Sequence, residues 1–320
     1  MVDVATHQEA DEAEAFANIL KPEAYGMFAA RQIQDVEAVP TPWPGLNTEC
    51  RGDGGRKGLA LGWHVILAGG TNMGKTNLAM NMAARVVQEG YACMIVSLEM
   101  ARHQIQQRIY SIISGIESDR LARGEFKAST IPELHDMDQR LTETIGIPPL
   151  LLVNDKPIRN IYAITNHLDQ YRHKYGVRVF IIDYLQLCQT GSDEDRRRQV
   201  MEVSAQLMAY AHQNGALTIG LSQFNRYTSR EKTRSPEVEG LTESSSLEND
   251  ADMVLLLDHS RYAVDTLRPW LHKTWLKIGK NREGSKGSVP IEWDWKTFRA
   301  REAMPDEVSM WPGGNGNGSK

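Results

Sequence analysis

Eight consecutive residues have the types and spacing of a phosphate-binding loop, the pattern GxxxxGK[ST]: Gly69, Gly70, Thr71, Asn72, Met73, Gly74, Lys75 and Thr76. Glycines let backbone N–H groups approach phosphate oxygens, and the helix expected after the loop offers its positive end. The Lys75 ammonium would reach the β and γ phosphates, and the Thr76 hydroxyl would ligate Mg²⁺. A glycine-rich turn with an exposed lysine is the alternative, but the position between a predicted strand and a predicted helix favours the phosphate site.

A second acidic group for Mg²⁺ is expected at the end of a neighbouring strand. Asp183 follows the apolar run 179–182 and is the candidate. Taken alone, this carboxylate could instead cap a turn after the strand. Tyr184 comes next, where many phosphate-loop motors carry a water-activating glutamate, so the general base must come from elsewhere.

Two further polar residues follow predicted strands, and ligands of open α/β sheets bind beyond the carboxyl ends of the strands. Glu99 comes after the strand that follows the phosphate-loop helix, and it is the candidate general base. Gln223 ends another strand and is the candidate sensor of the γ phosphate. The competing interpretations are an ordinary surface glutamate and an ordinary polar residue at a strand end.

Apolar runs that alternate with helical patterns predict βαβ units and a mainly parallel sheet flanked by helices, which is an α/β fold. The expected strands are 63–68, 93–97, 150–153, 179–182, 217–221 and 253–257. The expected helices are 75–88, 102–114, 160–174 and 199–213. Antiparallel edge strands are expected near the C-terminus, at 274–278 and 289–295.

The two ends of the chain differ in composition from this core. Residues 7–37 predict helices with too little apolar surface to stand alone, and one face carries Phe16, Ile19 and Leu20. Prolines and glycines from residue 40 to about residue 58 predict a linker. The expected organisation is a helical extension or linker at 1–39, the α/β domain at 40–304 and a flexible tail at 305–320.

The composition of the 320 residues bounds the class of protein. No apolar run approaches the roughly 20 residues that span a bilayer. The cysteines Cys50, Cys93 and Cys188 are far apart, which predicts neither a zinc site nor a disulfide framework and favours a cytoplasmic location. A net charge of -5 argues against coating nucleic acid over the whole surface, but a row of cations suits contact with a strand along one line: Arg226, Arg230, Lys232 and Arg234.

Six ordered motifs together resemble the C-terminal motor domain of DnaB-type replicative helicases. They are MGKT at 73–76, SLEM at 97–100, IDYLQL at 182–187, LSQFNR at 221–226, SLENDAD at 246–252 and KNREG at 280–284. They cover roughly residues 40 to 300, and the ordered set is far more specific than a phosphate loop alone. The resemblance implies a RecA-like phosphate-loop NTPase fold and a hexameric ring around single-stranded DNA, with ATP held between neighbouring subunits.

The resemblance also implies a role for each matching residue. Lys75 and Thr76 would hold phosphates and Mg²⁺, with Asp183 supporting the metal, Glu99 as the base and Gln223 as the phosphate sensor. Lys280 and Arg282 would enter the neighbouring subunit's site as a basic finger, where a guanidinium spreads positive charge over the transferred phosphoryl group. Taken alone, the segment 280–287 is a charged hairpin turn.

The segment 225–243 resembles the family's pore loop. It directly follows Gln223, so its position can change with the nucleotide state and move a bound strand. Backbone phosphates are the expected targets, because a motor ignores sequence. A surface loop without this role is the alternative. The predicted nucleic-acid contacts are Arg226, Arg230, Lys232, Arg234, Glu243 and Ser244.

The sequence also departs from the family's pattern. Only about 40 residues precede the motor, where the family usually has a separate helical domain that docks primase. These residues are expected to pack on the next subunit, and contact with a primase or a loader stays open. Gly70, Thr71 and Asn72 stand where many relatives have Arg-Pro-Ser, which leaves the phosphate cradle intact. Thr242 and Ser245 stand where Arg and Gly are usual, which leaves the DNA contacts open.

The sequence therefore predicts an ATP-dependent DNA helicase that acts at replication forks, of the compact kind carried by a phage or another mobile element. The first alternative is a RecA-like DNA-dependent ATPase, such as a recombination mediator, that binds single strands without unwinding. The second is a non-catalytic partner or loader of a larger helicase. The intact set of Lys75, Thr76, Glu99 and Asp183 argues against this second reading.

Overall fold

A computed structural model of the chain describes residues 38–50, 58–127, 130–141, 151–156, 158–191, 195–223, 244–309 and 311. The predictions for residues 1–37, 224–243 and 312–320 lie outside these residues.

A nine-stranded sheet of order β11-β10-β9-β8-β3-β7-β6-β4-β5 forms the centre of the described domain. The six strands from β8 to β5 run parallel, whereas β8, β9, β10 and β11 pair antiparallel. The strands are β3 His64–Gly69, β4 Cys93–Ser97, β5 Leu151–Asn154, β6 Val179–Asp183, β7 Leu217–Gln223, β8 Met253–Val264, β9 Leu271–Asn281, β10 Ser288–Asp294 and β11 Arg299–Glu302. A separate small sheet pairs β1 Ala38–Val39 with β2 Leu59–Ala60.

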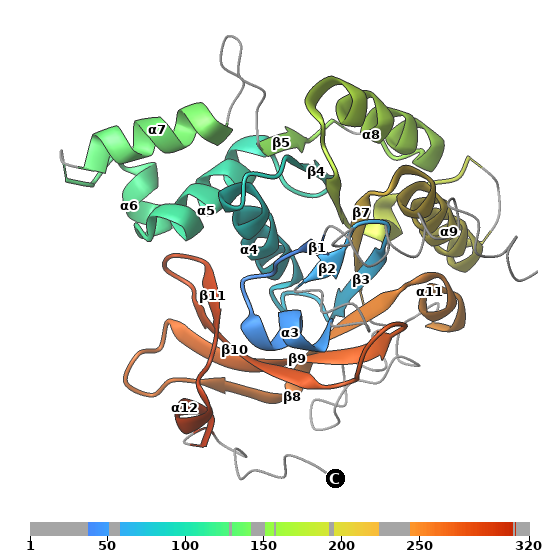
Figure 1. Cartoon of the computed structure of the whole chain (residues 1–320). Helices are drawn as coiled ribbons and strands as arrows, with labels where there is room; N and C mark the ends of the chain where they lie inside the picture. Colours follow the sequence, from blue (N-terminus) through green and yellow to red (C-terminus); the bar gives the residue numbers. More distant parts are fainter. Residues whose placement is uncertain are drawn as a thin grey trace, which may run out of the picture.

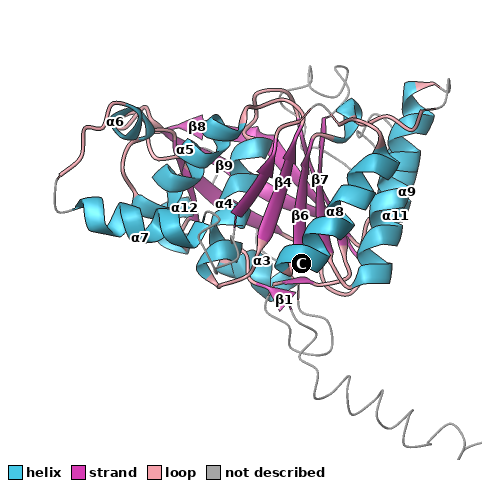
Figure 2. Cartoon of the chain, turned by 90° about the horizontal axis from the view of Figure 1, so that it is seen from above, coloured by secondary structure: helices cyan, strands magenta, loops and turns pink. Residues whose placement is uncertain are grey.

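Helices cover both faces of the parallel part of the sheet, with α4 and α5 on one side and α8 and α9 on the other (Figure 2). Figure 1 shows α11, in orange, beside α9, and the two helices are in contact. The helices are α3 Pro44–Glu49, α4 Lys75–Gln88, α5 Arg102–Ser114, α6 Ser118–Ala122, α7 Ile131–Leu141, α8 Ile161–Tyr175, α9 Arg196–Asn214, α11 Ser244–Asp250 and α12 Pro305–Ser309, with a 3-10 turn η2 Leu185–Leu187.

The central strands are apolar on both faces because each face packs on a helical layer. Val65 and Leu67 of β3 belong to the core under α4 and α5. Ile66 and Ala68, the alternating residues of the same strand, belong to the core under α8 and α9. This double burial explains why the strands appear in the sequence as continuous apolar runs rather than as alternating patterns.

The predicted fold class is confirmed. The sheet is mainly parallel, helices flank it, and its antiparallel strands lie at the C-terminal edge. The predicted helices 75–88 and 102–114 coincide with α4 and α5. Left-handed glycines delimit both, because Gly74 precedes α4 with φ 85° and Gly115 follows α5 with φ 76°.

The expectation of a linker from residue 40 to about residue 58 is wrong for residues 40–50. Pro44 starts α3 rather than breaking it, since a proline suits the first position of a helix. Trp43, Leu46 and Cys50 are fully buried in the core. The Trp43 indole N–H also donates to the Ala300 carbonyl at 3.1 Å, so this segment closes one end of the domain.

The predicted tail at 305–320 begins with residues that pack on the domain. Met304 and Glu307 are joined by a hydrogen bond at the start of α12, and Arg301 pairs with Glu307 at 2.7 Å. Trp311 is 5% exposed and meets the Trp275 ring at 6.1 Å between centroids. Residues of α12 and Trp311 therefore contact the domain, whereas residues 312–320 lie outside the described residues, so a flexible tail stays a prediction for 312–320 only.

The described residues contain no helix that is both long and apolar enough to cross a membrane. Cys50, Cys93 and Cys188 are buried free thiols. Burial raises the pKa of each of these thiols to about 12, so all three behave as inert apolar side chains.

Candidate nucleotide site

The carboxyl ends of four neighbouring strands, β3, β7, β6 and β4, bring the predicted site residues to one edge of the sheet. Gly69 at the end of β3 is paired with Gln223 at the end of β7. Asp183 at the end of β6 is paired with Ser97 at the end of β4, and Glu99 follows two residues later. The strand order thus gathers residues that are far apart in the sequence (Figure 2).

The phosphate loop connects β3 directly to α4, and its backbone conformation requires small residues at specific positions. Gly74 is left-handed, and a Cβ there would lie 2.1 Å from the Trp293 ring. Asn72 also has a positive φ of 59°, which Asn tolerates better than most residues. The Trp293 ring therefore packs against the loop and holds it at the start of α4, where backbone N–H groups have no helical partner.

Lys75 is the first residue of α4 and its side chain is 7% exposed. Its ammonium donates to the Gly70 carbonyl at 2.8 Å, which holds the side chain across the loop. Burial lowers the pKa of Lys75 to about 8, and the nearby charges of Asp183 and Glu99 oppose that shift. A phosphate bound in the loop would compensate the same buried positive charge.

The Thr76 hydroxyl donates to an Asp183 carboxylate oxygen at 2.8 Å. Asp183 is 3% exposed, and burial raises its pKa to about 6 although Thr76, Lys75 and Arg108 favour the charged form. Two oxygen donors lie side by side, and one of them is a carboxylate whose charged form is disfavoured by burial. Such a pair suits a hard divalent cation, which would favour the charged form. The donor set therefore fits Mg²⁺, and Thr76 and Asp183 would be its protein ligands.

Glu99 is exposed just beyond the end of β4, and its charge acts on both Lys75 and Asp183. The charge of Glu99 thus reaches the site, and its exposure leaves it accessible to water, while its role as the general base stays a prediction. Its position is fixed locally, because the Leu98 N–H donates to the Asp183 carbonyl at 2.9 Å and Ser97 bonds Met100 across the turn.

Arg108 on α5 lies close enough to Asp183 for their charges to interact, and the sequence analysis did not single it out. Burial lowers the pKa of its guanidinium, and the charge of Asp183 opposes that shift. The guanidinium carbon lies 4.8 Å from the centre of the Phe298 ring, which packs against it. The sequence could have indicated Arg108 because its helix, α5, starts directly after the SLEM motif. Residues three or four apart on such a helix share one face, and one of these faces lies toward the site.

Gln223 is half-buried at the end of β7, and a second glutamine holds the backbone there. The Gln223 N–H donates to the Gln186 side-chain oxygen at 3.2 Å, and the Gln186 amide donates to the Ser222 hydroxyl at 2.9 Å. Gln186 lies in η2, three residues after Asp183, so its hydrogen bonds connect the end of β7 to the end of β6.

Lys280 and Arg282 are not at this edge of the sheet. β9 runs antiparallel to β8, and Asn281 pairs with Met253, which pairs in turn with Val65 near the start of β3. Lys280 and Arg282 therefore lie level with the amino end of β3, whereas the phosphate loop follows its carboxyl end. β3 has six residues, so five residue steps separate its two ends, roughly 16 Å.

The predicted nucleic-acid contacts are not placed. Arg226, Arg230, Lys232, Arg234 and Glu243 lie outside the described residues. Ser244 begins α11, but only its backbone is described. These residues stay predictions from the sequence.

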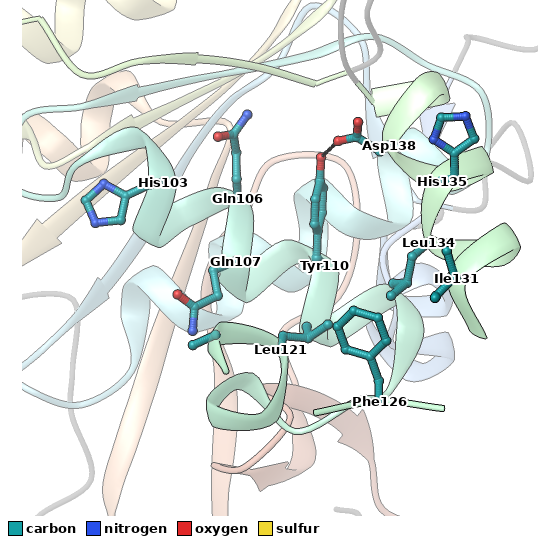
Figure 3. A pocket seen from close by; sticks show the side chains of 11 residues that line it. His103, Gln106, Gln107, Tyr110, Leu121, Phe126, Ile131, Leu134, His135 and Asp138 are labelled. Carbon is teal, nitrogen blue, oxygen red and sulfur yellow. Dashed lines mark hydrogen bonds between the residues drawn. The ribbon is translucent and has the colours of Figure 1, made fainter. Parts of the chain in front are cut away.

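A pocket of about 550 Å³ lies between α5, α6 and α7, apart from the phosphate loop (Figure 3). Its walls include Tyr110, Phe126 and Leu134, and the Tyr110 hydroxyl donates to Asp138 across the pocket. None of the residues predicted for the nucleotide site lines it. The sequence analysis predicted neither α6 nor α7, so it gave no sign of this pocket.

Comparisons with known proteins identify the family. A sequence model of the DnaB-like helicase C-terminal domain matches residues 45–302. The chain therefore belongs to this family. The probable plasmid replicative DNA helicase of Chlamydia psittaci is 28% identical over 238 residues, which are 74% of this chain and 50% of that protein. The replicative DNA helicase DnaB of Rickettsia conorii is 28% identical over 258 residues, which are 72% of this chain and 51% of that protein. The chain spans about half the length of these curated relatives.

Solved structures agree on the fold. The ATPase domain of G40P superposes with a TM-score of 0.71 at 22% identity, and the match covers 92% of this chain and 98% of that domain. A DnaB-like replicative helicase, studied with its interactions with primase, gives a TM-score of 0.71 at 21% identity and covers 90% of this chain and 66% of that one. The fold is therefore RecA-like.

Proposed function

We propose that this chain is the motor of an ATP-dependent DNA helicase of the DnaB type, which moves along single-stranded DNA as a ring and unwinds duplex at replication forks. Family membership supports the class of reaction. The observation that carries the proposal is the division of the nucleotide machinery between opposite edges of one sheet. Lys75, Thr76 and Asp183 lie at the carboxyl ends of the parallel strands and Arg282 at the opposite end, which supports a site that is completed by a second chain.

The residues at the first edge account for nucleotide binding and hydrolysis. Backbone N–H groups of the loop and Lys75 would bind the β and γ phosphates of ATP, and Thr76 with Asp183 would hold Mg²⁺, which neutralises charge that develops on the phosphates. Glu99 would orient the attacking water and accept its proton. Arg108 stabilises the ionised form of Asp183, and Gln223 would register the loss of the γ phosphate and transmit it to the segment 224–243.

The residues at the second edge account for assembly into a ring. Arg282 would enter the site of a neighbouring chain and stabilise the phosphoryl group during transfer, an effect worth several powers of ten in rate for such fingers. Head-to-tail contacts of this kind close into a ring when the rotation between chains permits it. A homo-hexamer on single-stranded DNA, with the cations of segment 224–243 (Arg226, Arg230, Lys232 and Arg234) facing the strand, is the assembly we propose.

Strand displacement on a forked DNA with ATP and Mg²⁺ tests the proposal, with ATPase rates recorded in parallel. We expect unwinding by the native chain and its loss in Glu99→Gln, because the glutamine cannot accept a proton. Hydrolysis that DNA stimulates without any unwinding would instead support the RecA-like ATPase that acts as a mediator. Absence of both, with ATP still bound, would indicate a non-catalytic partner of another helicase.

A further inference from the structure

Arg282, the proposed finger, is held on two sides by the chain that carries it. Its guanidinium donates to the Asp252 carboxylate at 3.0 Å and to the Asn249 carbonyl at 2.6 Å. Its backbone N–H donates to the Asp252 carbonyl at 3.0 Å. A guanidinium has five N–H donors in a rigid plane, so two acceptors fix the plane and leave further donors for a phosphate.

Asp252 is itself anchored from three directions. Its carboxylate accepts from the His64 backbone N–H at 2.8 Å and from the His212 ring nitrogen at 3.1 Å. Its own N–H donates to the His64 carbonyl at 2.8 Å. Asp252 is 5% exposed, whereas the Arg282 side chain is 41% exposed. A buried carboxylate with fixed partners thus supports a guanidinium that reaches into solvent.

The C-terminal end of α11 also lies beside Arg282 and Asp252. Lys280 donates to the Glu248 carbonyl and, at 3.3 Å, to the Asn249 carbonyl. The last carbonyls of a helix carry partial negative charge, so they favour both cations. α11 follows the segment 224–243 in the chain, and that segment follows Gln223. Asp252 therefore lies where β8, β9 and α11 meet, one residue before β8 begins.

We infer that Asp252 is the positioning residue of the finger: it sets the orientation in which Arg282 is presented to the nucleotide of the neighbouring chain. Asp252 acts through Arg282 and touches no nucleotide of its own chain. The inference rests on the proposed function, because it requires that Arg282 serves a neighbour.

Mixed assemblies test this role. We expect Asp252→Asn alone to lower the kcat of ATP hydrolysis at least tenfold and to change the KM for ATP less than about twofold, since the chain's own phosphate loop stays intact. Co-assembled with Lys75→Ala chains, which lack a working loop but have an intact finger, Asp252→Asn chains should recover activity. Arg282→Ala chains mixed with Lys75→Ala chains form the reference.

Two further variants separate positioning from folding. Glu292→Gln removes the charge of another buried carboxylate that pairs with an arginine, Arg301 at 2.6 Å, and that is not among the predicted site residues, so it should leave kcat within about twofold. Asp252→Glu retains the charge at a shifted position, and it should show a smaller defect that mixing also repairs. Thermal melts of all variants report folding independently of activity.

The outcomes are distinct. If Arg282→Ala recovers in the mixture and both Asp252 variants do not, Asp252 has a structural role only and the inference is overturned. If Arg282→Ala itself does not recover, the shared site is wrong, and the positioning role is lost with it. Recovery of both by a similar factor supports the inference.

Discussion

Arg108 illustrates how a single charge at the nucleotide site can be tested. It favours the ionised form of Asp183, whose burial works in the opposite direction. We expect Arg108→Ala to lower the kcat of ATP hydrolysis roughly 10- to 100-fold, as the loss of an outer partner of a metal-binding carboxylate typically does. Steady-state ATPase rates measure the effect. Arg102→Ala on the same helix removes an exposed arginine 4.0 Å from Asp155 and should be close to neutral. Equal losses in both variants would contradict a specific role of Arg108.

His64 provides a pH-dependent test at the residue scale. It is fully buried between Thr218 at 2.8 Å and Ser204 at 3.4 Å, and burial lowers its pKa to about 4. Between pH 6.5 and 4 the unfolded chain therefore binds a proton that the folded chain does not. Stability falls as the pH falls through this window, by about 1.4 kcal/mol per pH unit and on the order of 3 kcal/mol in total.

Urea unfolding of the native chain and of His64→Gln at pH 7 and pH 5 measures this contribution. The native chain should lose about 2 kcal/mol more than the variant, because glutamine does not titrate. Asp183 has the opposite sign, since its raised pKa contributes stability below pH 6 that is lost as the pH rises. It is present in both proteins, so it cancels in the comparison. An identical pH dependence in the two proteins would refute the assignment.

At the scale of elements, the sequence was most informative where one strong pattern determines the structure. The helix 75–88 has a glycine before it and an apolar stripe along one face. The apolar runs that begin at 93 and 179 are short and continuous, which is typical of buried parallel strands. Local patterns failed where tertiary contacts decide. Trp43 and Leu46 are fully buried in the core, and the Trp43 indole donates to the carbonyl of Ala300, 257 residues later in the chain.

The candidate site divides in the same way. Gly69 to Thr76, Asp183, Glu99 and Gln223 each follow a strand, and the strand order alone brings them together. Arg108 and Gln186 carry no motif by themselves, and their roles depend on which face of α5 or η2 meets the site. The position of Arg282 at the far edge depends on the antiparallel pairing of β8 and β9, which no local pattern specifies in register.

The short helix α3 supplies a prediction at this scale. Leu46→Ala should lower the free energy of unfolding by roughly 2 to 5 kcal/mol, because Leu46 is fully buried and its removal leaves a cavity. Denaturant unfolding measures the change. Thr48→Ala lies exposed on the same helix and should cost less than about 1 kcal/mol. If the two variants are equally stable, the segment 44–49 is not part of the cooperative core.

At the scale of the whole molecule, the residues before the motor domain carry a prediction from the sequence. In the proposed ring they pack on the next subunit, through the face that carries Phe16, Ile19 and Leu20. We expect deletion of residues 1–37 to weaken association at least tenfold while ATP binding by the single chain persists. Sedimentation velocity and fluorescent-nucleotide binding measure the two properties. Unchanged association would exclude this contact.

Under the proposed function, in which Arg282 completes the nucleotide site of a neighbouring chain, the placement of the phosphate loop and Arg282 at opposite ends of the strands has an arithmetic consequence for assembly. A row of n chains with free ends has n − 1 complete sites, and a closed row has n. A single chain has none. ATPase activity per chain should therefore vanish on dilution to single chains and rise with the number of chains in the row. It should reach its full value only when the ring closes, so the activity per chain reports the number of interfaces formed.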